Sequence, residues 1–201
     1  MNLNKLFPIQ KELDTRIERE KGLEGQNLLD KKILALQVEL GELANEWRGF
    51  KFWSNKQKPQ LAYNKGCDEC IGGISKSSPL LGPYRKCEYC RVNPLLEEYV
   101  DCLHFILSIG LEKNLEGVNV PLSDRLQVDI TTHFNEVFFW VSNFRDVVLD
   151  NGEFGDLDYI YRILFMQFIR LGEMLGFTTE QIEQAYLDKN KVNHERQAND
   201  Y

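Results

Sequence analysis

Apolar residues recur at intervals of three and four along almost the whole chain, and this spacing limits the folds that the chain can adopt. The clearest run consists of Leu29, Ile33, Leu36, Leu40, Leu43 and Trp47. Residues with this spacing lie on one face of an α-helix, and that face has to be buried against other elements. No stretch alternates apolar and polar residues as a half-buried strand does. The pattern therefore predicts an all-α helical bundle.

Residues typical of helix starts divide this pattern into five or six helices. Pro94 and Pro121 suit the first turn of a helix, and Thr178 stands three residues before Gln181, as in a capping box. We expect helices over residues 2–21, 28–50, 94–114, 121–149, 156–175 and 178–197.

Length and composition indicate one globular domain over residues 1–201. Of its 201 residues, 43% are hydrophobic, and no apolar run approaches the roughly 18 residues that would predict a membrane span. The first residues lack an apolar signal region, so we expect a cytoplasmic protein. A formal net charge of -7 argues against extensive phosphate contacts with nucleic acid and suits a chain that holds cations.

Residues 56–93 depart from the helical pattern. They carry seven basic side chains against three acidic ones, and two CxxC pairs formed by Cys67, Cys70, Cys87 and Cys90. In a chain without an export signal, two such pairs predict four thiolates around a structural Zn²⁺ that replaces a hydrophobic core. The alternatives are four reduced bystander cysteines or a catalytic dithiol. We expect a zinc-knuckle insert between two helices.

Carboxylates line one edge of the predicted helix 28–50. Glu39, Glu42 and Glu46 fall beside its apolar face, where like charges three and four residues apart repel one another. The predicted helix 94–114 is apolar on almost every side, yet it carries Glu98 and Asp101. A carboxylate on a buried helix needs a cation or many hydrogen bonds, because desolvating its charge is costly.

Two facing carboxylate pairs, ExxE and ExxD, would form an oxygen-only cage suited to Mg²⁺, which often carries substrate phosphates. The alternatives are that ExxE is an ordinary solvated helix face, or that a lysine supplies the compensating charge.

Four stretches share the motifs of one family. LQVELGELANEWR at 36–48 leads into FKFWS at 50–54, and DCLHFILS occupies 101–108; the remaining two are LFPIQKELD at 6–14 and YLDKNKVNHERQ at 186–197. These stretches resemble the dimeric, all-α dUTPase branch of the MazG-like NTP pyrophosphohydrolase superfamily. Residues 117–175 match that branch only in helical character.

The resemblance implies an enzyme that hydrolyses dUTP to dUMP and pyrophosphate with Mg²⁺. Glu39, Glu42, Glu98 and Asp101 would hold the metal, and Glu39 or Glu46 would orient or deprotonate the water that attacks the α-phosphorus. Hydrolysis at that phosphorus needs such metals and also cationic side chains near the leaving group.

The resemblance also implies a set of nucleotide-binding residues. Those facing the nucleoside would be Gln10, Trp53 and Asn193, and those facing the phosphates would be Lys189, Asn190 and Arg196. An amide such as that of Gln10 could match the edge of uracil. The alternatives are that Trp53 closes a core, that Gln10 is solvated, and that the residues near the C-terminus form a polar helical tail.

A homodimer is implied as well, and the predicted helix 121–149 carries more aromatic surface than its own core needs, at Phe134, Phe138, Phe139, Trp140 and Phe144. We expect His104 and Cys102 in the interior, and His133 and His194 at the surface. Two other functions stay open: a pyrophosphohydrolase for dCTP or a broader set of nucleotides, and a zinc-knuckle binding module on an inactive helical scaffold.

Overall fold

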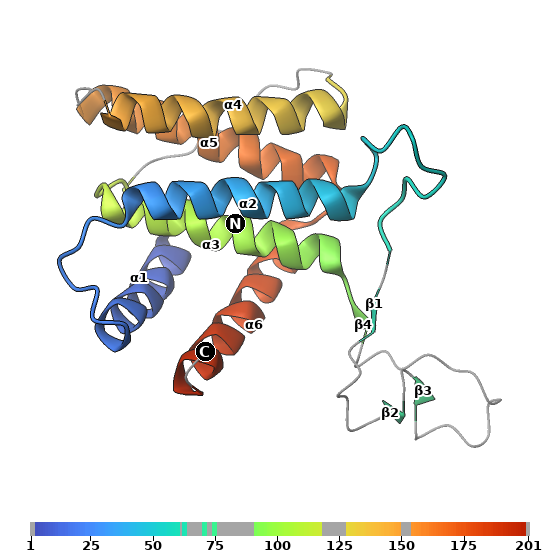
Figure 1. Ribbon diagram of the computed structural model, residues 1–201, viewed down its shortest axis with the longest axis horizontal. Coiled ribbons are helices and arrows are strands. Elements are labelled where there is room, and N and C mark those ends of the chain that lie inside the picture. Colours follow the sequence, from blue (N-terminus) through green and yellow to red (C-terminus); the bar gives the residue numbers. More distant parts are fainter. Residues whose placement is uncertain are drawn as a thin grey trace.

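Six helices form within the part of the chain that the computed structural model describes, which is residues 3–60, 62–63, 70–71, 74–75, 91–117, 128–149 and 154–199 (Figure 1). In chain order they are α1 (Leu3–Glu20), α2 (Leu29–Trp47), α3 (Pro94–Glu112), α4 (Ile130–Leu149), α5 (Phe154–Met174) and α6 (Thr179–Ala198). The predicted all-α class is confirmed.

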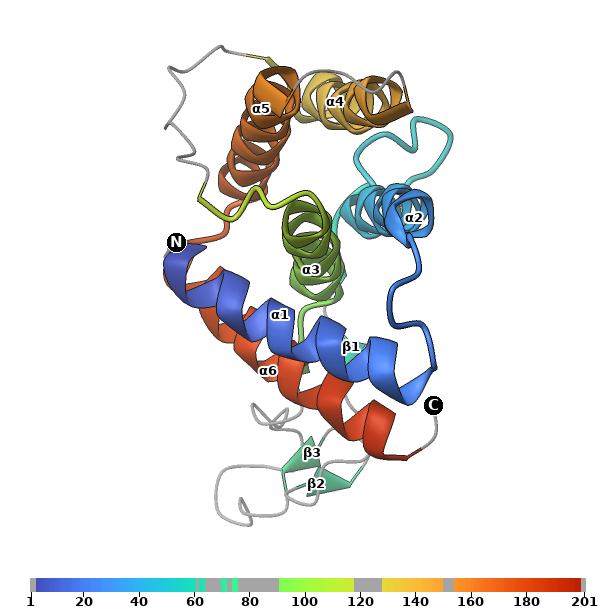
Figure 2. The same cartoon turned by 90° about the vertical axis from the view of Figure 1, so that its left-hand side faces the viewer.

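The helices stack in three layers. Antiparallel α2 and α3 form the middle layer, with α4 and α5 on one side and α1 and α6 on the other (Figure 1). Seen along α3, α1 and α6 run side by side and cross beneath it (Figure 2). Helix α3 contacts α1, α2, α5 and α6, which explains why its sequence is apolar on almost every side.

The apolar stripe of α2 is buried as its spacing predicts. Leu36, Leu40 and Leu43 are fully buried against the rest of the core, and burying each such side chain contributes roughly 1.5–3 kcal/mol. The helix ends at Trp47, three residues earlier than expected. Arg48 takes a left-handed conformation, with φ of 67°, and its N–H bonds the carbonyl of Ala44, which closes the helix.

Side-chain caps fix the starts of three other helices. Asn93 caps α3 ahead of Pro94, and Thr178 and Gln181 form the predicted capping box of α6. The sequence predicts a helix from residue 121 onward, but residues 128–129 are not helical and α4 begins at Ile130. The Asp129 carboxylate accepts hydrogen bonds from the backbone N–H and the hydroxyl of Thr132 and so caps the start of this helix.

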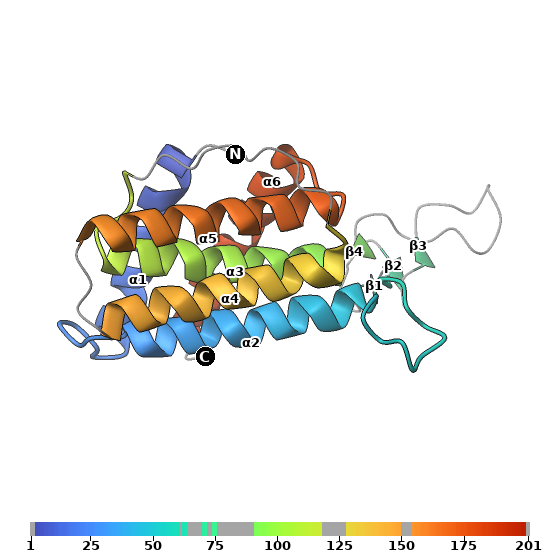
Figure 3. The same cartoon turned by 90° about the horizontal axis from the view of Figure 1, so that it is seen from above.

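Two short antiparallel ladders lie beyond the adjoining ends of α2 and α3 (Figures 1 and 3). β1 (Ala62–Tyr63) pairs with β4 (Arg91–Val92), and β2 (Cys70–Ile71) pairs with β3 (Ile74–Ser75). The side chains of all four paired cysteines lie outside the described residues, so the zinc knuckle stays a prediction. No helix in the described ranges is long and apolar enough to cross a membrane.

Candidate active site

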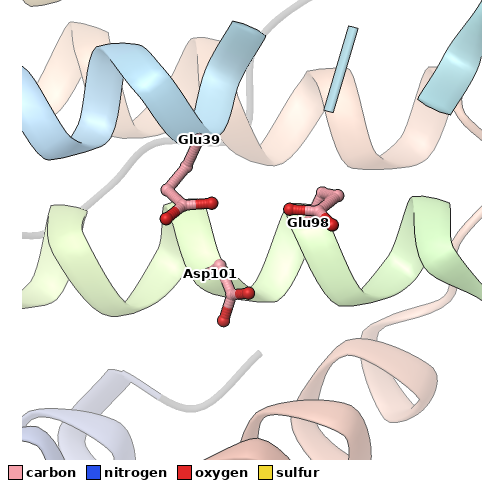
Figure 4. Close-up of side chains that lie close together, drawn as sticks. All are labelled: Glu39, Glu98 and Asp101. Atoms are coloured by element: carbon pink, nitrogen blue, oxygen red, sulfur yellow. The ribbon is translucent and has the colours of Figure 1, made fainter. Parts of the chain in front are cut away.

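Three carboxylates meet where α2 packs on α3. Glu39 points from α2 toward Glu98 and Asp101 of α3 (Figure 4), and one oxygen of each group lies within 4.8 Å of an oxygen of the other two. All three are partly buried. The structure thus brings together three of the four residues expected to hold Mg²⁺. Glu42 is exposed and lies outside this group of three, as does Glu46 one turn further along α2.

The cluster favours protons or cations over free negative charge. Burial, followed by the charges of Asp101, Glu42 and Glu39, raises the pKa of Glu98 to about 7. Burial is also the main cause that raises the pKa of Glu39, and the charges of Asp101 and Glu42 add to it. A divalent cation bound among these oxygens would relieve both the desolvation and the repulsion.

Lys189 of α6 is the internal counter-ion of this cluster. Its Nζ donates to Oδ2 of Asp101 at 2.6 Å and to Oε1 of Glu97 at 3.0 Å. Burial alone would lower the pKa of Lys189, but its hydrogen bonds and ion pairs with Asp101 and Glu97 outweigh burial and raise it. Lys189, expected from the resemblance to face phosphates, is therefore a charged ammonium directly beside the carboxylates.

Other α6 residues lie on the same side of the helix as Lys189. Burial raises the pKa of Asp101, and Arg196 is near enough for its charge to oppose that rise, as the hydrogen bond and charge of Lys189 do more strongly. The side-chain oxygens of Asn190 and Gln197 are buried and have no hydrogen-bond partner among the described residues. Asn193 is half-buried between them. Gln197 was not singled out from the sequence, although its helical spacing from Lys189, Asn190 and Asn193 is a signal that could have identified it.

Gln10 lies deep between α1, α3 and α6. Only 3% of it is exposed, so the alternative of a solvated Gln10 is wrong. Its amide bonds Asp14, His104 and Tyr186. His104 is buried as predicted and stacks on Tyr186, with 4.2 Å between ring centroids. His104 lies one turn after Asp101 on α3, a spacing that could have indicated a place beside the carboxylates.

Trp53 lies on the loop that follows α2, and 65% of it is exposed. The alternative that it closes a core is therefore wrong. Its ring packs edge-on against Phe50 and Phe52. Hydrogen bonds from Arg48 Nε to the carbonyl of Lys56 at 2.7 Å, and from Gln57 to the carbonyl of Lys51 at 2.9 Å, cross the loop. An exposed indole on such a loop is available to stack on a planar ligand.

The predictions about which cysteine, histidine and aromatic side chains are buried are confirmed for some residues and wrong for others. Cys102 is fully buried, as predicted. The expectation that His133 lies at the surface is wrong, because its ring is buried and Nε2 lies 2.8 Å from the carbonyl of Gln167. His194 is half-buried and accepts a hydrogen bond at Nδ1 from Arg16. Among the aromatic residues of α4, Phe134 and Phe144 are buried and Phe139 is exposed.

A family model described as dUTPase matches residues 2–72 and 86–201. The matched segments contain the three clustered carboxylates, the α6 residues beside them and both cysteine pairs. Comparison with curated proteins gives no match.

Proposed function

The chain belongs to the all-α dUTPase family, whose members are nucleoside triphosphate pyrophosphohydrolases. From this premise we propose that it cleaves dUTP to dUMP and pyrophosphate, with Mg²⁺ held at the carboxylate cluster. The observation that carries the proposal is the close group of Glu39, Glu98 and Asp101 between two packed helices. Lys189 offsets part of the negative charge at Asp101, and a divalent cation would offset the repulsion that remains among the three carboxylates.

The donor set fits Mg²⁺. All the candidate ligands are carboxylate oxygens, which this hard ion prefers. Burial and then the neighbouring carboxylate charges raise the pKa of Glu98, and a bound cation would counter both effects. We assign Glu39, Glu98 and Asp101 as ligands, with Glu42 as the fourth. Bound Mg²⁺ would neutralise the triphosphate and acidify a bound water.

The protein groups have separate tasks in the reaction. Water attacks the α-phosphorus, the bond from this phosphorus to the bridging oxygen breaks, and pyrophosphate leaves. Glu39 orients the water and accepts its proton, because its carboxylate belongs to the cluster that would hold the metal and its bound water. Glu46 is the alternative base, but it lies outside the cluster. Lys189 and Arg196 supply positive charge for the departing pyrophosphate, and Asn190 adds an amide.

The nucleoside would bind between α1, α6 and the loop after α2. Gln10 and Asn193 would present amides to the base, and Trp53 would cover it. Gln10 is already held in place by three neighbours, which leaves one N–H of its amide for the base. A base that cannot accept from this N–H would leave it unpaired, and this difference would favour the matching base.

We also propose that Cys67, Cys70, Cys87 and Cys90 hold one structural Zn²⁺. Two observations support this. The ladder between β1 and β4 joins the two ends of the segment that carries both pairs, and the family match includes both pairs. A homodimer and a cytoplasmic location, expected from the sequence, remain proposals.

The test is to incubate the purified protein with Mg²⁺ and each deoxynucleoside and ribonucleoside triphosphate, and to identify the products by chromatography. We expect dUMP and pyrophosphate from dUTP, and loss of turnover in Asp101→Asn. Asp188→Asn is the matched control, because Asp188 is exposed on α6 beside Lys189 and bonds only Gln184 among the contacts described. Cleavage of several bases would indicate a broader pyrophosphohydrolase, and no turnover of any nucleotide would refute the proposal.

A further inference from the structure

A chain of buried and partly buried hydrogen bonds leads from Asp14 on α1 to His104 on α3. Gln10 Nε2 donates to Oδ1 of Asp14 at 2.7 Å, and Gln10 Oε1 lies 2.7 Å from Nδ1 of His104. Tyr186 donates its hydroxyl to the same Gln10 oxygen at 2.9 Å. Ser108 donates to the other oxygen of Asp14 at 2.6 Å. The chain therefore connects three helices around one buried amide.

Asp14 determines which way the Gln10 amide points. A carboxylate only accepts hydrogen bonds, so it takes the NH₂ end of the amide and turns the carbonyl oxygen toward His104 and Tyr186. Burial raises the pKa of Asp14, but the hydrogen bonds from Ser108 and Gln10 and the charge of Lys32 oppose that rise. Lys32 lies 4.0 Å from Asp14 and stabilises the ionised form.

The orientation of Gln10 in turn fixes the protons of His104. A carbonyl oxygen cannot donate, so Nδ1 of His104 has to carry the proton of this hydrogen bond. Burial lowers the pKa of His104 to about 3, so the ring is neutral in ordinary buffers. Nε2 is then a bare acceptor, and it is buried without a partner in the described part of the chain. A buried acceptor without a donor is destabilising.

We propose that Asp14 is a positioning residue that acts through Gln10 to hold His104 as the Nδ1–H tautomer, so that Nε2 accepts a hydrogen bond from an N–H or O–H group of the bound nucleotide. The place of His104 in the fold supports this, since it lies one turn from Asp101 and packs flat on Tyr186 of α6. The nucleotide part of this inference rests on the proposed function, whereas the tautomer part does not.

The tautomer is measurable without any substrate. The chain has three histidines, so His133→Gln and His194→Gln identify the ring signals of His104 in spectra of ¹⁵N-histidine-labelled protein. The ¹⁵N shifts of the two ring nitrogens distinguish the tautomers. We expect a neutral Nδ1–H ring from pH 5 to pH 8, by the hydrogen-bond argument above. An Nε2–H ring in the parent protein would overturn the inference.

Variants of Asp14 test whether this residue sets the tautomer of His104. Asp14→Leu should mix the two tautomers and raise KM for dUTP by about tenfold, the effect of one lost hydrogen bond, with little change in kcat. Asp14→Asn should keep the tautomer, because its amide oxygen still accepts from Gln10. Glu18→Leu is the matched control, since Glu18 contacts Lys32 at 3.8 Å but is not bonded to Gln10. A tautomer unchanged in Asp14→Leu would overturn the role of Asp14.

Nucleotide binding tests whether Nε2 of His104 accepts a hydrogen bond from the ligand. Binding of dUMP should shift the Nε2 signal of His104, and binding without a shift would refute this contact. 2′,3′-Dideoxyuridine monophosphate lacks the sugar hydroxyl and dCMP lacks the imide N–H, so loss of the shift with one of them identifies the donor. If no uracil nucleotide binds, the proposed function fails, while the tautomer measurements still decide the role of Asp14.

Discussion

At the residue scale, Glu98 connects the stability of the protein to the proposed metal site. Its native pKa of about 7 exceeds the ordinary value of 4.5, so the native state binds its proton more tightly than the unfolded state does. The free energy of unfolding therefore decreases as the pH rises from about 4.5 to 7, and stays reduced above that range.

Glu98→Gln should remove the loss of unfolding free energy that ionisation of Glu98 causes. Without divalent metal at pH 8 we expect the variant to be more stable than the parent by about 1 kcal/mol, a reduced figure because water reaches the half-buried carboxylate. At pH 4 the difference should vanish. Urea unfolding in EDTA at both pH values measures this, with Glu136→Gln on the exposed side of α4 as the control. A variant less stable than the parent at pH 8 would show that Glu98 makes a net favourable contact.

Lys189 would compete with a metal ion for Asp101, since its Nζ lies 2.6 Å from Oδ2 of that residue. Lys189→Met leaves the carboxylates more negative and Asp101 free. We expect Mg²⁺ or Mn²⁺ to bind about fivefold more tightly in the absence of nucleotide, measured by titration calorimetry, while turnover of dUTP falls because a cation near the phosphates is lost. Lys191→Met, exposed on the same helix, is the control. Weaker metal binding in Lys189→Met would mean that Lys189 orders Asp101 for the metal.

At the element scale, helices were predictable wherever local chemistry sets them. The stripe of α2, the proline at the start of α3 and the capping box of α6 depend on neighbours in sequence. Errors arose where one residue overrides a pattern, as the left-handed Arg48 does at the end of α2 and the capping Asp129 does at the start of α4.

The site was predictable only as far as helical spacing reaches. Spacing put Glu98 and Asp101 on one face of α3, but the ion pair between Lys189 and Asp101 joins residues 88 positions apart. The burial of His133 likewise depends on a carbonyl of another helix. Such contacts follow from how helices pack, and a single sequence contains no local signal of them.

The insert allows a prediction about metal content. If the four cysteines hold Zn²⁺, the purified protein should contain about one zinc per chain by elemental analysis, and Cys87→Ser should lose it. Helical circular dichroism should persist, because the described helices pack around a core of their own. Cys102→Ser is the control, since Cys102 is buried on α3. Protein that binds no zinc when purified without chelator would leave the cysteines as ordinary thiols.

At the scale of the whole molecule, we expect the outer face of α4 to form the interface between two copies. Phe139 is 57% exposed and packs edge-on against Trp140, whose indole N–H is buried without a partner among the described residues. Exposed aromatic residues that lie together favour an interface, because covering them removes apolar surface from water.

We therefore expect a homodimer by light scattering, and Phe139→Asp should shift it toward monomer by placing a charge in the contact. Tyr159→Asp on α5 is the matched control, with 60% exposure at a separate position. A dimer that withstands Phe139→Asp but dissociates in Tyr159→Asp would move the interface to α5, and a monomeric parent protein would exclude the dimer.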